Sequence, residues 1–206
     1  MSEPMEIDVY YDYGCPYVYR AGIWMRDVQA ALGPGLRVNW RYFPLEQVNS
    51  DKGPDWKLWE QADDFRSRGL PAFRAAEAAR QQGDEAFRKF HLALLQARHE
   101  AGADLGKRET LLAAAEAAGL DRARFERDLA DRAHMAVIGR DYTQGRNELG
   151  VFGTPTFVFG NGRAAYIKLT DVPSPDAALP LFERFTETVR DEPLVEEIKR
   201  PRKPEQ

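Results

Sequence analysis

Residues 10–19 read YYDYGCPYVY, and this stretch contains Cys15, the only cysteine of the 206-residue chain. Between residues 6 and 12, apolar and acidic side chains largely alternate, which is the period-2 pattern of a β-strand. From 18 to 32, apolar residues recur at spacings of three and four, and a Gly-Pro-Gly sequence then ends the run, so a helix is predicted there. Pro16 suits the first turn of that helix. Cys15 is therefore expected at a strand-to-helix turn.

A lone cysteine is more often a small buried hydrophobe than a reactive group. The position of Cys15 at the start of a helix favours the reactive interpretation, because unpaired backbone N–H groups and the positive end of the helix dipole stabilise a thiolate there. Asp12 lies three residues earlier and would oppose that effect if its carboxylate approached the sulfur. Cys15 is thus a candidate nucleophile.

A second informative stretch is residues 149–159, LGVFGTPTFVF. It places the pair Thr154-Pro155 directly before an apolar run that ends at a Gly-Asn-Gly sequence, which predicts a loop, a strand and a hairpin turn. Residues 164–169 are then expected to form the returning strand. A proline at the head of a strand is also allowed on backbone grounds alone.

Together the two stretches resemble the thioredoxin superfamily. Within it they resemble the DsbA-like proteins, which include FrnE-type oxidoreductases and, more distantly, 2-hydroxychromene-2-carboxylate isomerases and kappa-class glutathione transferases. The resemblance spans most of the chain. In that family a Cys-Pro-x-Cys motif follows the first strand, and a Val/Thr-Pro pair with a cis peptide bond faces the active thiol. Cys15, Pro16 and Tyr17 match the first three motif positions, and Thr154 and Pro155 match the second motif.

The resemblance implies Cys15 as the catalytic residue and Pro16, Tyr17, Thr154 and Pro155 as substrate-binding residues. The chain departs from the dithiol members at Val18, which stands where they carry a second cysteine. A mixed disulfide on this chain would have to be resolved by an external thiol, so monothiol exchange is expected. No tightly bound cofactor is expected; the external thiol would be glutathione or another low-molecular-weight thiol. The expected substrate is a disulfide-containing protein or a small-molecule thiol.

Two other functions remain open at this stage. The isomerase and kappa-transferase branch carries serine at the first motif position and activates glutathione's thiolate there, so a glutathione-dependent isomerase or transferase is the second hypothesis. Loss of the second cysteine would also be compatible with a non-catalytic binding module. Replacing Cys15 by serine separates the first two, because exchange chemistry needs its sulfur and cofactor-thiolate chemistry does not.

Between the two motifs, residues from about 56 to 132 have helical spacing and several glycine breaks. An all-helical block inserted between two halves of a thioredoxin fold is what the DsbA-like resemblance implies, and the predicted fold class is α/β. Residues 36–42 alternate like a strand, and 179–189 predict a closing helix. We expect one domain over 1–190, with the helical block near the thiol, and a flexible tail over 191–206.

Composition excludes several function classes. The chain has 29 Lys and Arg against 33 Asp and Glu, a net charge of −4, which gives no electrostatic case for binding nucleic acid or a membrane surface. The three histidines, His91, His99 and His134, share no metal-ligand spacing with Cys15, so no metal site is expected. The N-terminal residues lack a charged segment leading into an apolar one, which predicts a cytoplasmic protein. The oligomeric state is not encoded in any recognisable pattern.

Overall fold

The computed structural model describes residues 4–200 of the chain; residues 1–3 and 201–206, which include the end of the predicted tail, lie outside the described part. Its centre is a four-stranded sheet with the strand order β2-β1-β3-β4. β1 runs parallel to β2, whereas β3 is antiparallel to both β1 and β4. The strands are β1 (Met5–Tyr11), β2 (Leu36–Tyr42), β3 (Thr156–Phe159) and β4 (Ala164–Tyr166).

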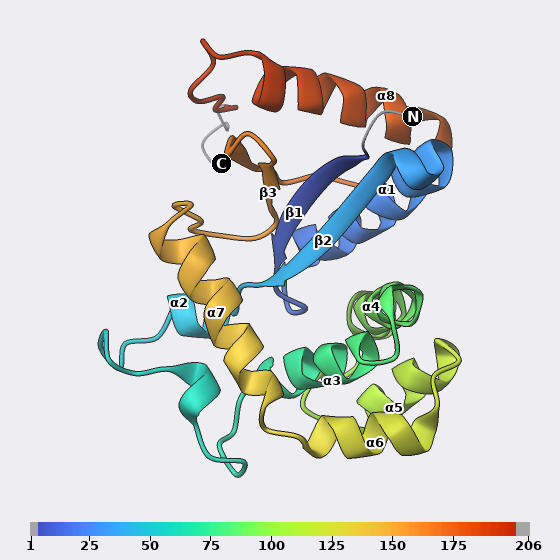
Figure 1. Ribbon diagram of the computed structural model, residues 1–206, viewed down its shortest axis with the longest axis vertical. Helices are drawn as coiled ribbons and strands as arrows, with labels where there is room; N and C mark the ends of the chain where they lie inside the picture. The colour runs from blue at the N-terminus through green and yellow to red at the C-terminus, as the bar shows by residue number, and fades with distance from the viewer. Residues whose placement is uncertain (1–3, 201–206) are drawn as a thin grey trace, which may run out of the picture.

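Two helices, α1 (Pro16–Leu32) and α8 (Pro175–Thr186), pack together beside the sheet (Figure 1). Trp24 on α1 is fully buried and joins them to the sheet: its ring contacts Phe157 of β3 and Phe182 of α8, and its indole N–H donates to the carbonyl of Ala178 at 2.9 Å. A buried indole needs such an acceptor, since an unpaired N–H would cost free energy. α8 continues into a short π-helical turn, Glu187–Asp191.

The chain between β2 and β3 is mostly helical. α3 to α6 gather below the sheet, and α7 runs from that group back toward the sheet (Figure 1). Asp121 caps α6 by accepting a hydrogen bond from the amide of Arg124 at 2.9 Å. The helical pattern in the sequence spans about 56–132, and α7 continues beyond it. The elements are α2 (Leu45–Val48), η2 (Leu58–Glu60), α3 (Leu70–Arg80), α4 (Asp84–His99), α5 (Arg108–Ala117), α6 (Arg122–Ala130) and α7 (His134–Asn147).

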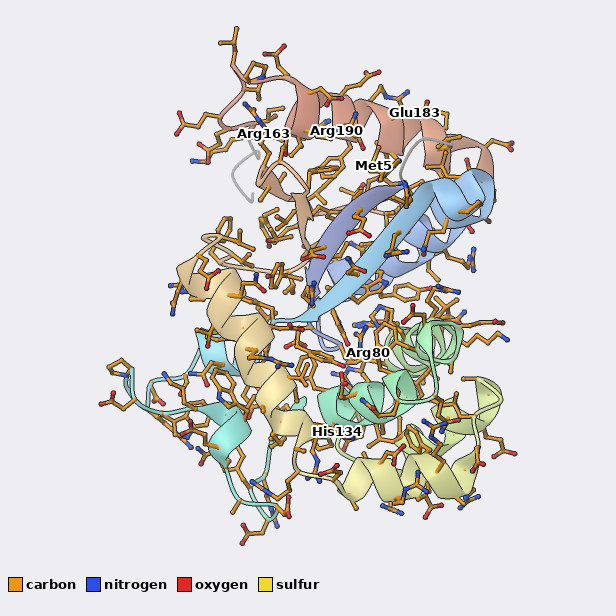
Figure 2. The ribbon with its side chains drawn as sticks, viewed as in Figure 1. Met5, Arg80, His134, Arg163, Glu183 and Arg190 are labelled. Atoms are coloured by element: carbon orange, nitrogen blue, oxygen red, sulfur yellow. The ribbon has the colours of Figure 1, made fainter. Side chains whose placement is uncertain are left out.

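A buried polar network joins the sheet to these helices. The hydroxyl of Tyr42, at the end of β2, donates to Glu77 of α3 at 2.7 Å. Arg80, one turn later, pairs with Glu77 at 3.3 Å and donates to the carbonyl of Trp40 at 3.0 Å. Figure 2 shows Arg80 at this boundary, between the strands and the helices. Charges are tolerated there because each one has a partner.

One strand differs from its prediction. The sequence predicts a returning strand over 164–169, whereas β4 ends at Tyr166. The amide of Ile167 still donates to the carbonyl of Pro155 at 3.2 Å. Pro155 has no backbone N–H that could donate a second hydrogen bond to this strand, so the β-ladder ends at this point.

Candidate active site

Cys15 occupies the N-cap of α1, directly after the turn that follows β1. Its backbone is extended, with φ −83° and ψ 117°, and its amide donates to the carbonyl of Asp12 at 3.1 Å, which closes the turn. Pro16 is the first helical residue, where a missing N–H costs nothing. The thiol therefore lies at the positive end of the α1 dipole.

The fold brings the two sequence motifs together. The peptide bond between Thr154 and Pro155 is cis. The Sγ of Cys15 donates to the carbonyl oxygen of Thr154 at 3.3 Å, a contact between residues 139 positions apart in the chain. Cys15 is 6% exposed and Thr154 2% exposed, so the thiol is recessed beneath the surface next to this loop.

The side chain of Thr154 has an unusual environment. Its Oγ1 is buried and has no hydrogen-bond partner within residues 4–200. Leaving a buried hydroxyl unpaired costs roughly 1–3 kcal/mol. Native proteins keep few such groups, and one beside a candidate nucleophile is available to a bound molecule.

Asp12 is buried and helps to hold the turn. Its two carboxylate oxygens accept from the amide of Gly14 at 2.6 Å and from the amide of Leu45 at 2.7 Å. Burial raises the pKa of Asp12, and the two amide hydrogen bonds act in the opposite direction. Asp12 therefore ties the Cys15 turn to the start of α2.

Two histidines of α4 contact Tyr13, two residues before the thiol. The Nε2 of His99 lies 2.9 Å from the carbonyl of Tyr13, and because a carbonyl only accepts, this nitrogen carries the proton. The Nδ1 of His91 lies 3.1 Å from the Tyr13 hydroxyl. Burial lowers the pKa of His99 and lowers that of His91 to about 3, with the nearby Arg80 adding to the effect on His91.

Sequence reasoning missed these contacts. None of the three histidines lies in the Cys15 turn, and their spacing does not fit a metal site. The available signal was that His91, Leu95 and His99 recur every four residues, which places them near one face of a helix. In residues 4–200, no three His, Cys, Asp or Glu side chains are grouped in a way that could hold a metal ion.

Of the tyrosines around the thiol, Tyr17 is partly exposed, whereas Tyr11 and Tyr13 are fully buried. The guanidinium carbon of Arg20 lies 5.4 Å from the centre of the Tyr17 ring, and the Nζ of Lys168 lies 5.0 Å from it. Tyr17 is thus half-buried between two cations. Cation–π contacts of this kind hold a ring in place while leaving part of its surface accessible.

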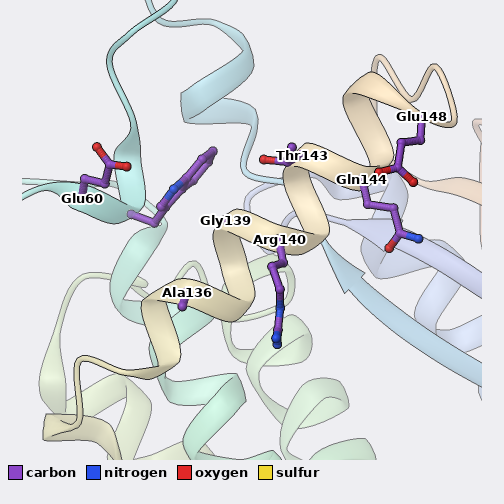
Figure 3. Close-up of a pocket in the computed structure, with 8 residues that line it drawn as sticks. Glu60, Ala136, Gly139, Arg140, Thr143, Gln144 and Glu148 are labelled. Carbon is purple, nitrogen blue, oxygen red and sulfur yellow. The ribbon is translucent and has the colours of Figure 1, made fainter.

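A groove of about 730 Å³ lies elsewhere, along α7 (Figure 3). Trp59 packs against Gly139 at its floor; a Cβ on Gly139 would lie 2.6 Å from the indole nitrogen. Arg140 on α7 and Glu148 directly after it supply charged side chains. None of the candidate site residues lines this groove, so it is separate from the thiol.

The sequence model of the DSBA-like thioredoxin domain matches residues 6–178. The chain belongs to this family. It is also 30% identical over 202 residues to an uncharacterized protein of Mycobacterium tuberculosis, covering 96% of this chain and 83% of that protein. The DSBA-like membership confirms the predicted α/β thioredoxin-like fold with inserted helices.

Solved structures share this DSBA-like fold. A thioredoxin-like oxidoreductase from Silicibacter pomeroyi superposes with a TM-score of 0.56 at 24% identity, covering 90% of this chain and 88% of that one. The cytosolic disulfide reductase DsbM from Pseudomonas aeruginosa gives 0.61 at 18%, covering 89% and 99%. A 2-hydroxychromene-2-carboxylate isomerase gives 0.61 at 19%, covering 89% and 96%.

Within the DSBA-like fold, Val18 is fully buried on the inner face of α1. It occupies the position at which the dithiol motif has its second cysteine, and Cys15 has no partner thiol in the chain. Among the residues that the structure describes, no helix combines the length and apolarity needed to span a bilayer.

Proposed function

We propose that this DSBA-like protein is a thiol–disulfide oxidoreductase that works through a single nucleophilic cysteine. The observation that carries the proposal is the Cys15 thiol at the N-cap of α1, 3.3 Å from the carbonyl that precedes a cis-proline. A thiolate formed there is stabilised by the helix dipole and faces a loop backbone that can align a substrate.

The reaction has two exchange steps. The Cys15 thiolate attacks one sulfur of a substrate disulfide, a bond forms between the two sulfurs, and the other substrate sulfur leaves as a thiolate that takes a proton from solvent. An external thiol then attacks the mixed disulfide, which releases Cys15 and leaves the substrate sulfur disulfide-bonded to that thiol. Val18 cannot serve as an internal resolving group, so the second step needs a separate molecule.

The surrounding residues have distinct proposed roles. Pro16 fixes the turn, and Tyr17 forms one side of the substrate surface. Thr154, held before Pro155, offers its backbone and its unpartnered hydroxyl to the substrate. The external thiol is glutathione or a similar small thiol, and the substrate is a disulfide-containing protein or small molecule. A cytoplasmic setting, rich in such thiols, suits this cycle.

Mass spectrometry tests this proposal directly. The reduced protein is treated with an excess of a small disulfide, and the mass of the intact chain and of its peptides is followed. We expect one adduct at Cys15 that glutathione removes, with none in the Cys15→Ala variant. Absence of an adduct on the folded wild-type protein would contradict the nucleophile assignment.

A second candidate function is a glutathione-dependent isomerase or transferase. The observation in its favour is Val18, which removes intramolecular disulfide chemistry, together with a fold shared with the isomerase. In this case the bound thiol supplies the reacting sulfur, and Cys15 only positions it. Activity with Cys15→Ser decides between the two: exchange is lost in that variant, whereas cofactor-thiolate chemistry is retained.

A further inference from the structure

A positively charged, aromatic surface borders the thiol. Lys168 follows β4 and is exposed, and its Nζ lies 5.0 Å from the centre of the Tyr17 ring and 5.3 Å from that of Tyr166. These two rings come from different elements, Tyr17 from the start of α1 and Tyr166 from the end of β4. Lys168 therefore bridges the first motif and the strand next to the second.

The backbone around Lys168 is tied to the thiol by a short series of hydrogen bonds. The preceding residue, Ile167, donates its amide to Pro155 at 3.2 Å. Thr154, bonded to that proline, accepts from the Cys15 thiol at 3.3 Å. The backbone that carries Lys168 is thus hydrogen-bonded, one residue earlier, to the loop that faces the sulfur.

A second cation, Arg20, also contacts Tyr17. The guanidinium carbon of Arg20 lies 5.4 Å from the ring, and its Nη1 donates to the carbonyl of Leu169 at 2.8 Å. Arg20 therefore anchors the residue that follows Lys168. Two positive charges therefore lie beside one ring, although the chain as a whole carries a net charge of −4.

An exposed aromatic side chain, Phe152, adds apolar surface beside Tyr166. Phe152 is 61% exposed, and its ring meets the edge of Tyr166 with centres 5.1 Å apart. Gly153 permits this arrangement, since a Cβ there would lie 3.2 Å from the Tyr166 ring. Phe152 and Tyr166 together form an apolar surface next to Lys168, and contiguous exposed apolar surface favours contact with a bound molecule.

We propose that Lys168, supported by Tyr17 and Arg20, selects disulfides that carry a carboxylate a few bonds from the attacked sulfur, with Phe152 contacting their apolar part. The proposal rests on the exchange function assigned to Cys15. A carboxylate on the substrate complements the two cations, so it speeds encounter and orients the disulfide toward the sulfur. The same chemistry occurs in small acidic disulfides and in peptides with an acidic residue beside cysteine.

The test compares rates of Cys15 adduct formation with three disulfides of similar size and different charge: dithiodipropionate, bis(hydroxyethyl) disulfide and cystamine. We expect the wild-type protein to react fastest with the anionic probe and slowest with the cationic one, with the difference shrinking as salt is added. Lys168→Gln should slow the anionic probe by about threefold to tenfold and leave the neutral probe within about twofold. Lys168→Arg should retain most of the preference.

Lys89→Gln is the matched control, because Lys89 is an exposed lysine on α4 that pairs with Glu85; it should leave all three rates unchanged. A Lys168→Gln variant that slows all three probes equally, or a wild-type protein that prefers cystamine, overturns the charge selection. No adduct with any probe instead refutes the exchange function itself. A peptide disulfide with aspartate beside cysteine, compared with its asparagine form, then shows whether the selection extends to peptides.

Discussion

Protonation of His91 should destabilise the folded protein as the pH falls below neutral. The imidazole is 3% exposed and is packed among aromatic rings, with centres 4.3 Å from Trp40 and 4.7 Å from Tyr11. Burial, reinforced by Arg80, lowers its pKa from 6.5 to about 3. The folded state therefore keeps His91 neutral in a range where the unfolded chain protonates it.

The sign and size of the effect follow from this difference. Between about pH 6.5 and pH 3 the unfolded state binds more protons than the folded state. The free energy of unfolding therefore has its highest value above this range and decreases as the pH falls through it. At about pH 5 the contribution lost is about 2 kcal/mol relative to neutral pH. This loss of about 2 kcal/mol is the same for any folded-state pKa of His91 below about 4. At about pH 5 the folded state is then almost unprotonated, so the loss depends only on protonation of the unfolded state.

Guanidinium unfolding followed by tryptophan fluorescence, from about pH 7 to pH 5, measures this loss. The comparison variant is His91→Phe, which keeps a ring in the site and removes the titration. It starts less stable, because Tyr13 loses its hydrogen-bond partner, but its stability should fall by about 2 kcal/mol less over the same range. His99, whose pKa is also lowered, accounts for part of any remaining slope.

Equal pH slopes for the wild type and His91→Phe would refute the reasoning. If the variant does not fold, the His91 ring signals in an NMR titration of the wild type provide the answer. They should stay constant over this range, and a shift with a midpoint near pH 6 would show that the imidazole is protonated in the folded state.

Two further outcomes follow from close contacts in the structure. Gly145→Ala should lower the free energy of unfolding by about 1–3 kcal/mol in a denaturant titration, because its Cβ would lie 2.5 Å from the buried Tyr10 ring; Gly160→Ala, with no atom within 4 Å, is the control and should be neutral. Asp12→Ala should lower the free energy of unfolding by about 1–3 kcal/mol for each backbone amide left without an acceptor, and it should slow adduct formation at the thiol. Asp12→Asn should lower the free energy of unfolding by roughly half as much. An unchanged stability for Asp12→Ala would show that Leu45 and the turn find other acceptors.

Several features of this protein were readable in the chain alone. The alternation ending at Tyr11, the proline behind Cys15 and the Gly-Pro-Gly stop predicted β1, the turn and α1, because strand and helix periods and helix ends are properties of neighbouring residues. The pair Thr154-Pro155 before an apolar run was equally local. The family resemblance then supplied the expectation that these two places face each other.

Tertiary packing decided the rest. The sulfur contact to Thr154, the histidine contacts to Tyr13 and the place of Lys168 between two tyrosines each join segments far apart in the chain. No local period encodes such a meeting, because it depends on sheet register, on where α4 packs and on how soon β4 ends. The sequence thus determined the scaffold and the place of the single cysteine at a strand-to-helix turn, and the folded structure determined which charges and rings lie around that turn.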